Sequence, residues 1–440
     1  MNRNKNRSVS YYRVIPRLVR VGVPQTVTVS PMGDGKKFDD ALDYIVTFVP
    51  RECFSESWIG GVAPAFDTIT VRPINGVISV TYTFDEEQEY VISLKPLTDQ
   101  KISAKKLSLE FCVYALNNDL YELDPYRGDL HSHSTGSDGR EDPVIVAANY
   151  RKEGYDFFAL TDHRNWDSSN ELVEKFSTLP LGFKIFRGEE VHIPDNWIHI
   201  VNFGGRYSVN TLYRSDPERY DTEIAERAKS LAVPKGVNAL EYAYRQWITE
   251  EIRRSGGISI VAHPYWIYHQ SYNMCDRMLD YVLETGVYDA FELVGGQSVH
   301  ENNVQNAFYQ EQRAKGRQIP IVGSSDSHGT DPASYFGVGQ TIVFAKNTDM
   351  DSIVDAIKGG YSVAIEKAYG EEERVYGSYR MVKYARFLLD YYFPAHDELC
   401  VEEGILMREY ALGDEEAADG IVAAANRVKR HMKKALRGEV

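Results

Sequence analysis

The sequence lacks the features of a membrane protein and of a disulfide-bonded one. Among its 440 residues no uninterrupted apolar run is long enough to span a bilayer, and no signal-peptide core follows the polar stretch 1–10. Its four cysteines, Cys53, Cys112, Cys275 and Cys400, are widely spaced, with no C-x-x-C pair that would bind zinc or carry redox chemistry. These absences predict a cytoplasmic protein with no membrane partner, whose cysteines are free thiols buried in the interior.

Two widespread catalytic motifs are also missing. The chain has no Gly-x-x-x-x-Gly-Lys phosphate loop and no Gly-x-Ser-x-Gly nucleophile elbow. Its net charge of -15 at pH 7 repels polyanions at long range, which favours a small anionic substrate over nucleic acid without excluding the latter. Hydrophobic residues make up 43% and charged residues 26%, as in ordinary globular proteins. The sequence does not indicate the oligomeric state.

The first part of the chain predicts a β-sandwich. Short runs with period-two alternation are separated by turn residues, at 26–30, 44–49, 77–84, 90–94 and 107–115. The polar stretch 85–89 between two of these runs is typical of a hairpin loop, and several closely spaced strands indicate an antiparallel sandwich. We therefore predict a small antiparallel β-sandwich over residues 1–125, with a role in packing or in shaping a substrate cleft.

From residue 126 onward strands and helices alternate, which is typical of an α/β fold with parallel strands and crossover helices. In one such unit Asp142 caps a helix, Pro143 occupies its first turn, and Gly154 ends it. The strand predicted at 156–161 then leads directly to Asp162 and His163.

The same arrangement recurs twice further along. A strand predicted at 258–262 leads to His263, and one predicted at 319–325 leads to Asp326 and His328. In a (β/α) barrel the C-terminal ends of the strands converge, so these polar residues are predicted to share one site. We predict a hydrolase barrel over residues 126–370.

Two further segments complete the predicted organisation. Residues 205–254, with a helical pattern over 240–253, separate two candidate ligands and are interpreted as an insertion or lid. Residues 371–440 are predicted to form a helical C-terminal extension. Its basic end, 427–437, is attributed to the helix macrodipole rather than to a nucleic-acid or membrane surface.

Metal-binding side chains recur at the predicted strand ends. His131 and His133 are two residues apart, so on an extended strand both face one way and can bind one cation. Imidazoles together with carboxylates suit Zn, Mn or Fe ions. The candidate ligands are too many for one ion but enough for two or three, and they are His131, His133, Asp138, His163, Glu190, His199, His263, Asp326 and His328.

As an ordered set these residues resemble the PHP (polymerase and histidinol phosphatase) family. The resemblance covers residues 127–366 and is carried by His131-x-His133, Ser137-Asp138-Gly139, Thr161-Asp162-His163, the Glu190 strand, His199, His263-Pro264 and Asp326-x-His328. It implies a distorted (β/α)7 barrel with a two- or three-metal cluster that hydrolyses phosphate esters.

The resemblance also implies a division of the ligands. One ion would be held by His131, His133, Glu190 and Asp326, and a second by Asp138, His163 and His263. Glu190 would bridge, and His199 and His328 would complete a third position. Glu190 is preferred to Glu189 because the family pattern places its glutamate two residues after a glycine, here Gly188. The catalytic residues implied are Asp138, His163, Glu190, His263 and Asp326.

Candidate substrate contacts lie beside these ligands, and they are Arg164, His192, Tyr265, Trp266 and His269. Arg164, directly after His163, is favoured over Arg140 and Arg187 as a phosphate clamp, although such an arginine is as often part of a surface ion pair. Asp162 is expected to orient a ligand or to cap a turn.

We therefore expect a metal-dependent phosphoesterase in which a metal-bound hydroxide hydrolyses a small phosphorylated metabolite or nucleotide. Two alternatives stay open. One is a single-strand exonuclease on the same barrel, whose binding would fall steeply with salt. The other is a glycan- or partner-binding protein with an inactive barrel, which is disfavoured because no ligand position is missing.

Overall fold

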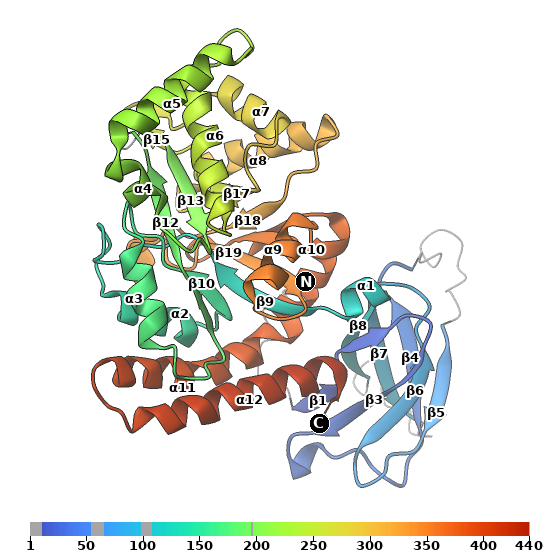
Figure 1. Cartoon of the computed structure of the whole chain (residues 1–440). Coiled ribbons are helices and arrows are strands. Elements are labelled where there is room, and N and C mark those ends of the chain that lie inside the picture. The colour runs from blue at the N-terminus through green and yellow to red at the C-terminus, as the bar shows by residue number, and fades with distance from the viewer. Residues whose placement is uncertain (1–10, 54–65, 98–107, 195–196, 440) are drawn as a thin grey trace. The chain divides into compact units, whose positions relative to one another are not determined.

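The computed structural model describes residues 11–53, 66–97, 108–194 and 197–439, within two compact units (Figure 1). The first unit comprises residues 1–123, 386–396 and 428–440, and the second comprises residues 124–385 and 397–427. The C-terminal helices thus divide between the units. In the described ranges, none of the helices has the length and apolar character needed to cross a membrane.

The first unit contains two β-sheets around one core. The three-stranded sheet has the order β1 (Tyr12–Ile15), β3 (Pro24–Pro31) and β6 (Ile78–Thr83). The five-stranded sheet has the order β2 (Leu18–Arg20), β8 (Leu109–Leu116), β7 (Glu89–Pro96), β4 (Tyr44–Pro50) and β5 (Thr68–Val71). Val27 and Val29 of one sheet and Val46 and Phe48 of the other share the core, since alternate residues of a strand face the same side.

The prediction of a hairpin at residues 85–89 is wrong. Strand β6 pairs with β3, whereas β7 pairs with β4 and β8, so this stretch carries the chain from one sheet to the other. A period-two pattern identifies the buried face of a strand but not its partner, and a polar link fits either outcome. The predicted run at 107–115 begins at a residue outside the described ranges.

The cysteines are free, as predicted, but not all are buried. Cys112 and Cys400 are buried, Cys53 is partly exposed, and Cys275 is exposed. Cys275 is the residue directly before helix α7 (Asp276–Glu284), where the helix start keeps it at the surface. The prediction of burial is therefore wrong for Cys275.

The second unit contains the two larger sheets of the α/β fold. One has the order β11 (Lys184–Phe186), β10 (Phe157–Ala159), β9 (Asp124–Asp129), β19 (Gly339–Ala345), β20 (Ser362–Glu366) and β21 (Arg374–Tyr376). The other has the order β12 (Gly188–His192), β13 (His199–Phe203), β14 (Ile258–Val261), β17 (Ala290–Val294) and β18 (Ile321–Gly323). Phe157 and Val343 of one sheet share a core with Val201 and Ile260 of the other.

The two sheets approach each other where their strands end. Isolated bridges join Ser132 to Ser327 and His163 to Glu190. Parallel pairs, such as β9 with β10 and β14 with β17, occur beside antiparallel ones, such as β12 with β13 and β9 with β19. The mixed α/β class is thus confirmed. The strand pairs of the described residues form two sheets rather than one ring of seven strand–helix repeats.

Helices lie between these strands along the chain and after the last of them. They are α2 (Pro143–Lys152), α3 (Asp167–Lys175), α4 (Val209–Ser215), α5 (Pro217–Ser230), α6 (Ala239–Arg254), α7, α8 (Val299–Ala314), α9 (Met350–Lys358), α10 (Tyr379–Tyr391), α11 (Phe393–Ala411) and α12 (Ala417–Arg437). The predicted start of α2 is confirmed, because the Asp142 side chain accepts from Val144 N at 3.1 Å. The helical C-terminus is also as predicted.

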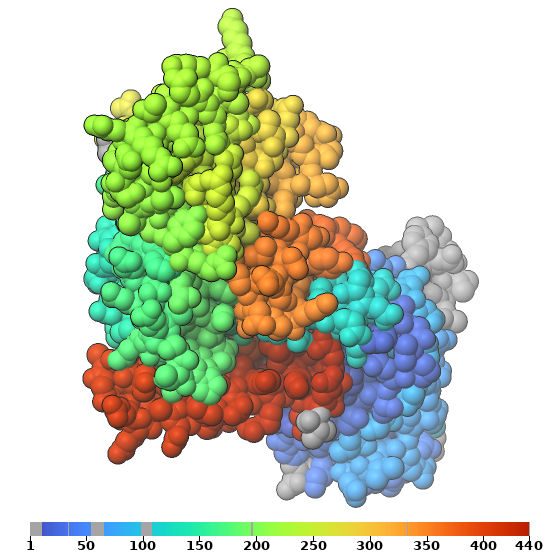
Figure 2. All heavy atoms as spheres, in the orientation of Figure 1, coloured from blue at the N-terminus to red at the C-terminus, as the bar shows by residue number. Residues whose placement is uncertain are grey.

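The segment 205–254 is helical and belongs to the second unit. Figure 2 shows it, in green, forming part of the surface of that unit. Its inner face is apolar, with Trp247, Ile248 and Ile252 of α6 buried in a core that also contains Val191 and Val261 of β12 and β14. The segment is therefore packed on the sheet that carries part of the site described next.

Candidate metal centre

Ligand-type side chains gather where strands of the second unit end. His131 and His133 follow β9, His163 follows β10, Glu190 lies in β12, His199 opens β13, His263 follows β14, and Asp326 and His328 follow β18. Segments far apart in the sequence thus contribute to one group. For the residues that follow β9, β10, β14 and β18 the cause is the one predicted, namely that the carboxyl ends of these strands meet at one edge. His199 reaches the same edge because β13 runs antiparallel to its neighbours and begins there.

Glu190 is the centre of this group, and its side chain is fully buried. Its Oε2 lies 2.6 Å from His163 Nδ1 and 3.4 Å from His131 Nε2. Its Oε1 lies 3.0 Å from His199 Nδ1 and 3.2 Å from His263 Nε2. Both carboxylate oxygens therefore face imidazole nitrogens, an arrangement in which one carboxylate can serve two cations.

Asp326 provides a second buried carboxylate on the side of His131 and His133. Its Oδ1 lies 2.9 Å from His133 Nε2 and 3.3 Å from His131 Nε2. These two histidines, Glu190 and Asp326 form one group in which each residue offers an atom within 4.8 Å of the others.

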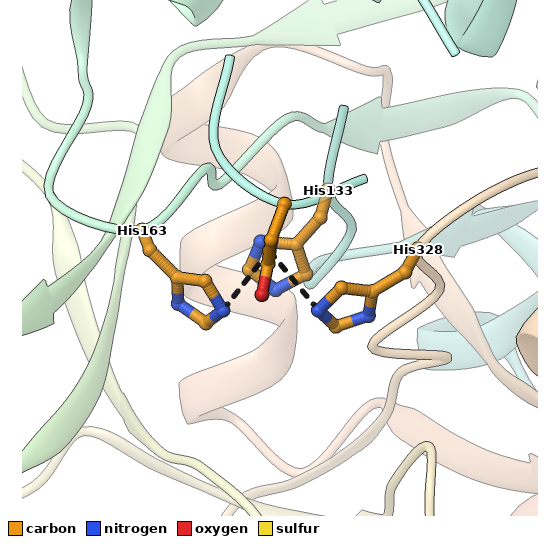
Figure 3. Close-up of side chains that lie close together, drawn as sticks. His133, His163 and His328 are labelled. Carbon is orange, nitrogen blue, oxygen red and sulfur yellow. Dashed lines mark ion pairs between the residues drawn. The ribbon is translucent and has the colours of Figure 1, made fainter. Parts of the chain in front are cut away.

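A more open group surrounds Asp138. Figure 3 shows His163 and His328 pointing toward a carboxylate between them, with His133 behind. Asp138 Oδ1 lies 3.3 Å from His163 Nε2 and 3.3 Å from His328 Nε2, and the side chain of Asp138 is 59% exposed. This group therefore faces solvent, whereas the Glu190 group is enclosed.

The grouping of His263 and His328 differs from the division implied by the family resemblance. His263 lies with His199 beside Glu190, because the two residues come from the paired strands β13 and β14. His328 lies with Asp138 and stacks on His133 at 4.4 Å between ring centroids.

Several buried polar atoms in the cluster have no hydrogen-bond partner. They include His133 Nδ1 and His263 Nδ1. Leaving a buried polar group unsatisfied costs about 1–3 kcal/mol, so the polypeptide alone does not account for this arrangement. Imidazole nitrogens and carboxylate oxygens at these spacings fit divalent cations of the Zn, Mn or Fe type.

The electrostatics of the enclosed group also favour cations. Burial by itself raises the pKa of Glu190, but the surrounding histidines, His163 first, hold that pKa well below its usual value. Burial lowers the pKa of His133 to about 3, so its ring is neutral at pH 7. An ionised carboxylate beside a neutral imidazole is the state that binds a metal ion.

His163 behaves differently from His133. Burial opposes its charged form, but Glu190 and Asp138 raise the pKa of His163 to about 10. A cation that binds here must therefore displace a proton from this ring.

Glu292 is a residue of the site that the sequence analysis missed. Its Oε2 lies 3.0 Å from His131 Nδ1, and its Oε1 accepts a hydrogen bond from His263 N at 3.1 Å. A carboxylate on the far nitrogen of a ligating imidazole fixes the orientation and tautomer of the ring. The available signal was a glutamate within the apolar, fully buried strand Ala290–Val294.

Asp162 and Glu189 are carboxylates next to the site that accept hydrogen bonds from neighbouring loops. Asp162 accepts from Ser134 N at 2.7 Å and from Ser137 Oγ at 2.7 Å, and so shapes the loop that carries Asp138, in agreement with the turn role expected for it. Glu189 accepts from Ser208 Oγ at 2.8 Å, at the start of α4. Neighbouring residues of a strand face opposite sides, so Glu190 faces the histidines and Glu189 does not.

His192, predicted as a substrate contact, lines the cavity described below and also lies among the ligand-type side chains. Its Nε2 is 3.2 Å from Glu190 Oε2 and 2.8 Å from His163 Nδ1, and the residue is buried. Two residues after Glu190 on the same strand, it shares the face of that glutamate. Period-two spacing within β12 was the signal that indicated this position.

A cavity of about 730 Å³ opens beside the cluster. Ligand-type side chains line it, together with Arg164, with the aromatic residues Trp197, Trp266, Tyr268 and Tyr272, and with the polar residues Ser137, Ser271 and Asn273. This volume is in the range of small-molecule sites. No described residue of the segment 205–254 lines it.

Two predicted substrate contacts do not line this cavity. Tyr265 is buried in the core, and its hydroxyl donates to Asp276 Oδ1 at 3.0 Å. His269 lies at the exposed turn between β15 (Ile267–Tyr268) and β16 (Ser271–Tyr272). Closeness to a candidate ligand in sequence does not determine which way a loop residue points, so these two residues lie away from the cavity wall.

The three arginines considered as phosphate clamps, Arg164, Arg140 and Arg187, differ in their position relative to the cavity. Arg164 lines the cavity, where its backbone N donates to Glu190 O at 3.0 Å in a left-handed conformation with φ of 56°. Arg140 pairs with Asp331 at 3.5 Å, and Arg187 Nε donates to Asn170 Oδ1 at 2.6 Å. Neither of these two lines the cavity, so Arg164 is the one of the three arginines that does.

No family model matches the chain. Over 85 residues it is 35% identical to the DNA polymerase/3'-5' exonuclease PolX of Bacillus subtilis. This aligned region covers 19% of this chain and 15% of that protein. The chain thus spans a small part of that relative.

Solved structures are also similar. One is a two-domain protein from Bacteroides vulgatus described as containing a PHP-like metal-dependent phosphoesterase, with 17% identity, a TM-score of 0.40, and coverage of 55% of this chain and 65% of that one. Another is described as a metal-dependent phosphoesterase of Bifidobacterium adolescentis, with 19% identity, a TM-score of 0.32, and coverage of 46% and 87%. A third is an amidohydrolase from Chromobacterium violaceum, with 17% identity, a TM-score of 0.32, and coverage of 46% and 87%. The predicted resemblance to PHP-like proteins is confirmed to this extent.

Proposed function

We propose that the second unit is a metal-dependent phosphoesterase of the PHP type that hydrolyses the phosphate ester of a small molecule. The observation that carries the proposal is the convergence of six histidines on the two oxygens of buried Glu190, with ring nitrogens left without a hydrogen-bond partner. We further propose that the two sheets form the distorted barrel of that family.

The ligand groups assign the residues to two or three cations. His131, His133, Glu190 and Asp326 would hold one ion, and Asp138, His163 and His328 would hold another with His133 beside them. Glu190, His199 and His263 form a further group. Glu190 would bridge these positions because it belongs to more than one of them.

Bound divalent cations supply Lewis acidity, which lowers the pKa of water and neutralises charge on a phosphoryl group. The residues of the chain do the rest of the positioning. Glu292 holds the His131 ring, Asp162 holds the loop of Asp138, and Arg164 faces the cavity with a guanidinium suited to phosphate oxygens. In the reaction a bond forms between water oxygen and phosphorus, the ester P–O bond breaks, and the alcohol leaves with a proton.

The test measures metal content by elemental analysis and hydrolysis of an aryl phosphate and of mononucleotides, in the native protein and in His131→Ala and Asp138→Asn variants. Two or more ions per chain, with turnover lost in both variants, are expected. A native protein that retains no metal and hydrolyses no phosphoester would overturn the proposal.

A second candidate is exonuclease activity on single-stranded ends, which the similarity to the 3'-5' exonuclease PolX of Bacillus subtilis favours. Among the described residues that line the cavity, Arg164 is the one lysine or arginine, which argues for a substrate with few phosphates. Full activity on a mononucleotide with a flat salt response would remove this candidate.

A further inference from the structure

We propose that the cavity takes phosphate esters whose leaving group carries a flat aromatic ring, and that the aromatic residues of its wall bind this ring. The wall is defined as Trp197, Trp266, Tyr268 and Tyr272. This inference rests on the proposed function, because it names the substrate class of the same site.

The wall exposes more aromatic surface than packing requires. Trp197 is 49% exposed, Tyr268 is 56% exposed, and Tyr272 is 41% exposed, although all three line the cavity. Isolated exposed apolar side chains are common, but several grouped at one cavity mark a binding surface. Aromatic rings gain most from a partner that is itself flat, because offset stacking adds to the area buried.

The wall is anchored to the candidate ligands by a short stretch of backbone. Trp266 follows His263 after two residues, and Trp266 N donates to His263 O at 3.0 Å. The β15–β16 hairpin is closed by Asn273 N donating to Trp266 O at 2.9 Å, and Ile267 N donates to Glu301 Oε1 at 2.8 Å. Tyr268 and Tyr272 are therefore held at a set distance from the candidate metal centre.

The rings continue outward from the ligands without a break. Trp266 lies 5.5 Å from His263 and 6.1 Å from His199 between ring centroids, and it stacks with Tyr268 at 5.1 Å with an interplanar angle of 27°. Tyr272 rests edge-on against the buried ring of Tyr265 at 5.0 Å. A planar group placed on this wall would thus lie next to the phosphoryl position.

The charges of the cavity favour a ring over a longer anionic chain. Its cationic side chain other than histidine is Arg164, and the carboxylates that line it, Asp138 and Asp326, belong to the ligand groups. The wall itself carries no acidic group, and Ser271 and Asn273 beside it offer a hydroxyl and an amide for hydrogen bonds with the edge of a ring. One phosphoryl group attached to one planar ring matches this distribution.

The test compares binding of three non-hydrolysable probes to the metal-loaded protein by calorimetry: phenylphosphonate, cyclohexylphosphonate and methylphosphonate. The variants are Tyr268→Ala with Tyr272→Ala, and Ile267→Ala as a matched control, because Ile267 is exposed on the same hairpin and does not line the cavity. The native protein and the control should bind phenylphosphonate about tenfold or more tightly than the other two. The double variant should lose this preference and keep its affinity for methylphosphonate.

Equal binding of the phenyl and cyclohexyl probes, or a preference that survives in the double variant, would overturn the inference. A parallel assay separates this failure from that of the proposed function. If the native protein hydrolyses glycerol phosphate and phenyl phosphate equally well, the phosphoesterase proposal stands and the ring inference falls. If it hydrolyses neither but the probe preference is present and sensitive to the double variant, the wall binds rings and the phosphoesterase proposal falls.

Discussion

Two groups of buried charged side chains in the second unit differ in how their charge is balanced. Near α2, Arg151 and Glu403 are both fully buried, with Arg151 Nε donating to Glu403 Oε2 at 2.8 Å and Arg151 Nη1 donating to Tyr155 O at 2.9 Å. Glu403 Oε1 also accepts from Gly182 N at 2.6 Å. Around Glu190, by contrast, the side chains within ion-pair distance in the described part of the chain are histidines.

This difference in charge balance distinguishes an ion pair that stabilises the fold, Arg151 with Glu403, from charged side chains that serve a function, those around Glu190. In the Arg151 group each ion has a partner from the polypeptide, so the group is complete in the folded chain. In the Glu190 group the carboxylates face imidazoles instead, of which the His133 ring is neutral because burial lowers its pKa to about 3, whereas Glu190 and Asp138 raise the pKa of His163 to about 10. A divalent cation bound here would take the place of the proton on His163 and balance the carboxylates. The first group should therefore respond to mutation through stability, and the second through metal content and turnover.

The largest effect is expected from Glu190→Gln. The amide keeps the shape but removes the charge that several histidines face, so metal content and turnover should both fall, turnover by about a thousandfold or more. Elemental analysis and the rate of phosphoester hydrolysis measure these losses, and the thermal unfolding of metal-free protein should stay close to that of the native chain. A variant with full metal content and undiminished rate would remove the distinction between the groups.

Next in size is Glu403→Ala, which leaves Arg151 buried without its partner. The free energy of unfolding should fall by about 3–5 kcal/mol, measured by chemical denaturation, while metal content per folded chain stays unchanged. Glu402→Ala is the matched control, because Glu402 is 56% exposed and pairs with Arg427 at the surface. That variant should cost about 1 kcal/mol or less. Equal losses for the two variants would show that burial does not set the cost.

Glu292→Gln probes the boundary between the groups, since this carboxylate holds a ligand rather than being one. Metal affinity should fall by about 10- to 100-fold with the fold intact, because the His131 ring loses a charged acceptor. Competition with a metal-binding dye gives the affinity. An unchanged affinity would place Glu292 with the purely structural charges.

The smallest effect is expected at Asp280, a carboxylate near the surface. Burial raises its pKa, but Lys315 and Arg317 outweigh this and lower the pKa to about 2. Stability from the ionised form is thus present above the unfolded pKa of about 4 and is lost as the pH falls toward 2. Asp280→Asn should cost about 1 kcal/mol at pH 7, limited by solvent screening, and nothing near pH 2. Denaturation curves at both pH values check this, and a cost that is independent of pH would contradict it.

The sequence could predict which side chains gather at the candidate site because imidazoles and carboxylates at strand ends have few structural uses, and because the order of His131, His163, His263 and Asp326 matches a known series. It could also predict the start of α2, where the capping residue acts locally. It could not predict that residues 85–89 link two sheets, because strand pairing depends on distant partners. Glu292 was missed because one glutamate in an apolar strand has no spacing pattern of its own.

The same limit applied to the substrate contacts. Tyr265 and His269 both stand near candidate ligands in sequence, yet Tyr265 is buried in the core and His269 lies at an exposed turn, whereas His192 lines the cavity. A hairpin inserted after His263 decides which side chains reach the cavity. The hairpin contacts Glu301, which lies far along the chain, so no local sequence pattern predicts this packing.

The candidate ligands come from strands of two different sheets, which share a core and are joined by isolated bridges from Ser132 to Ser327 and from His163 to Glu190. A cation held by His131, from one sheet, and Glu190, from the other, would act as a cross-link between them. At a hundredfold excess over its dissociation constant, such an ion would stabilise the native state by about 2.7 kcal/mol. Metal loading would then slow amide exchange in β9 and β12 together. The bound ion would therefore also lower the rate at which proteases cleave the second unit.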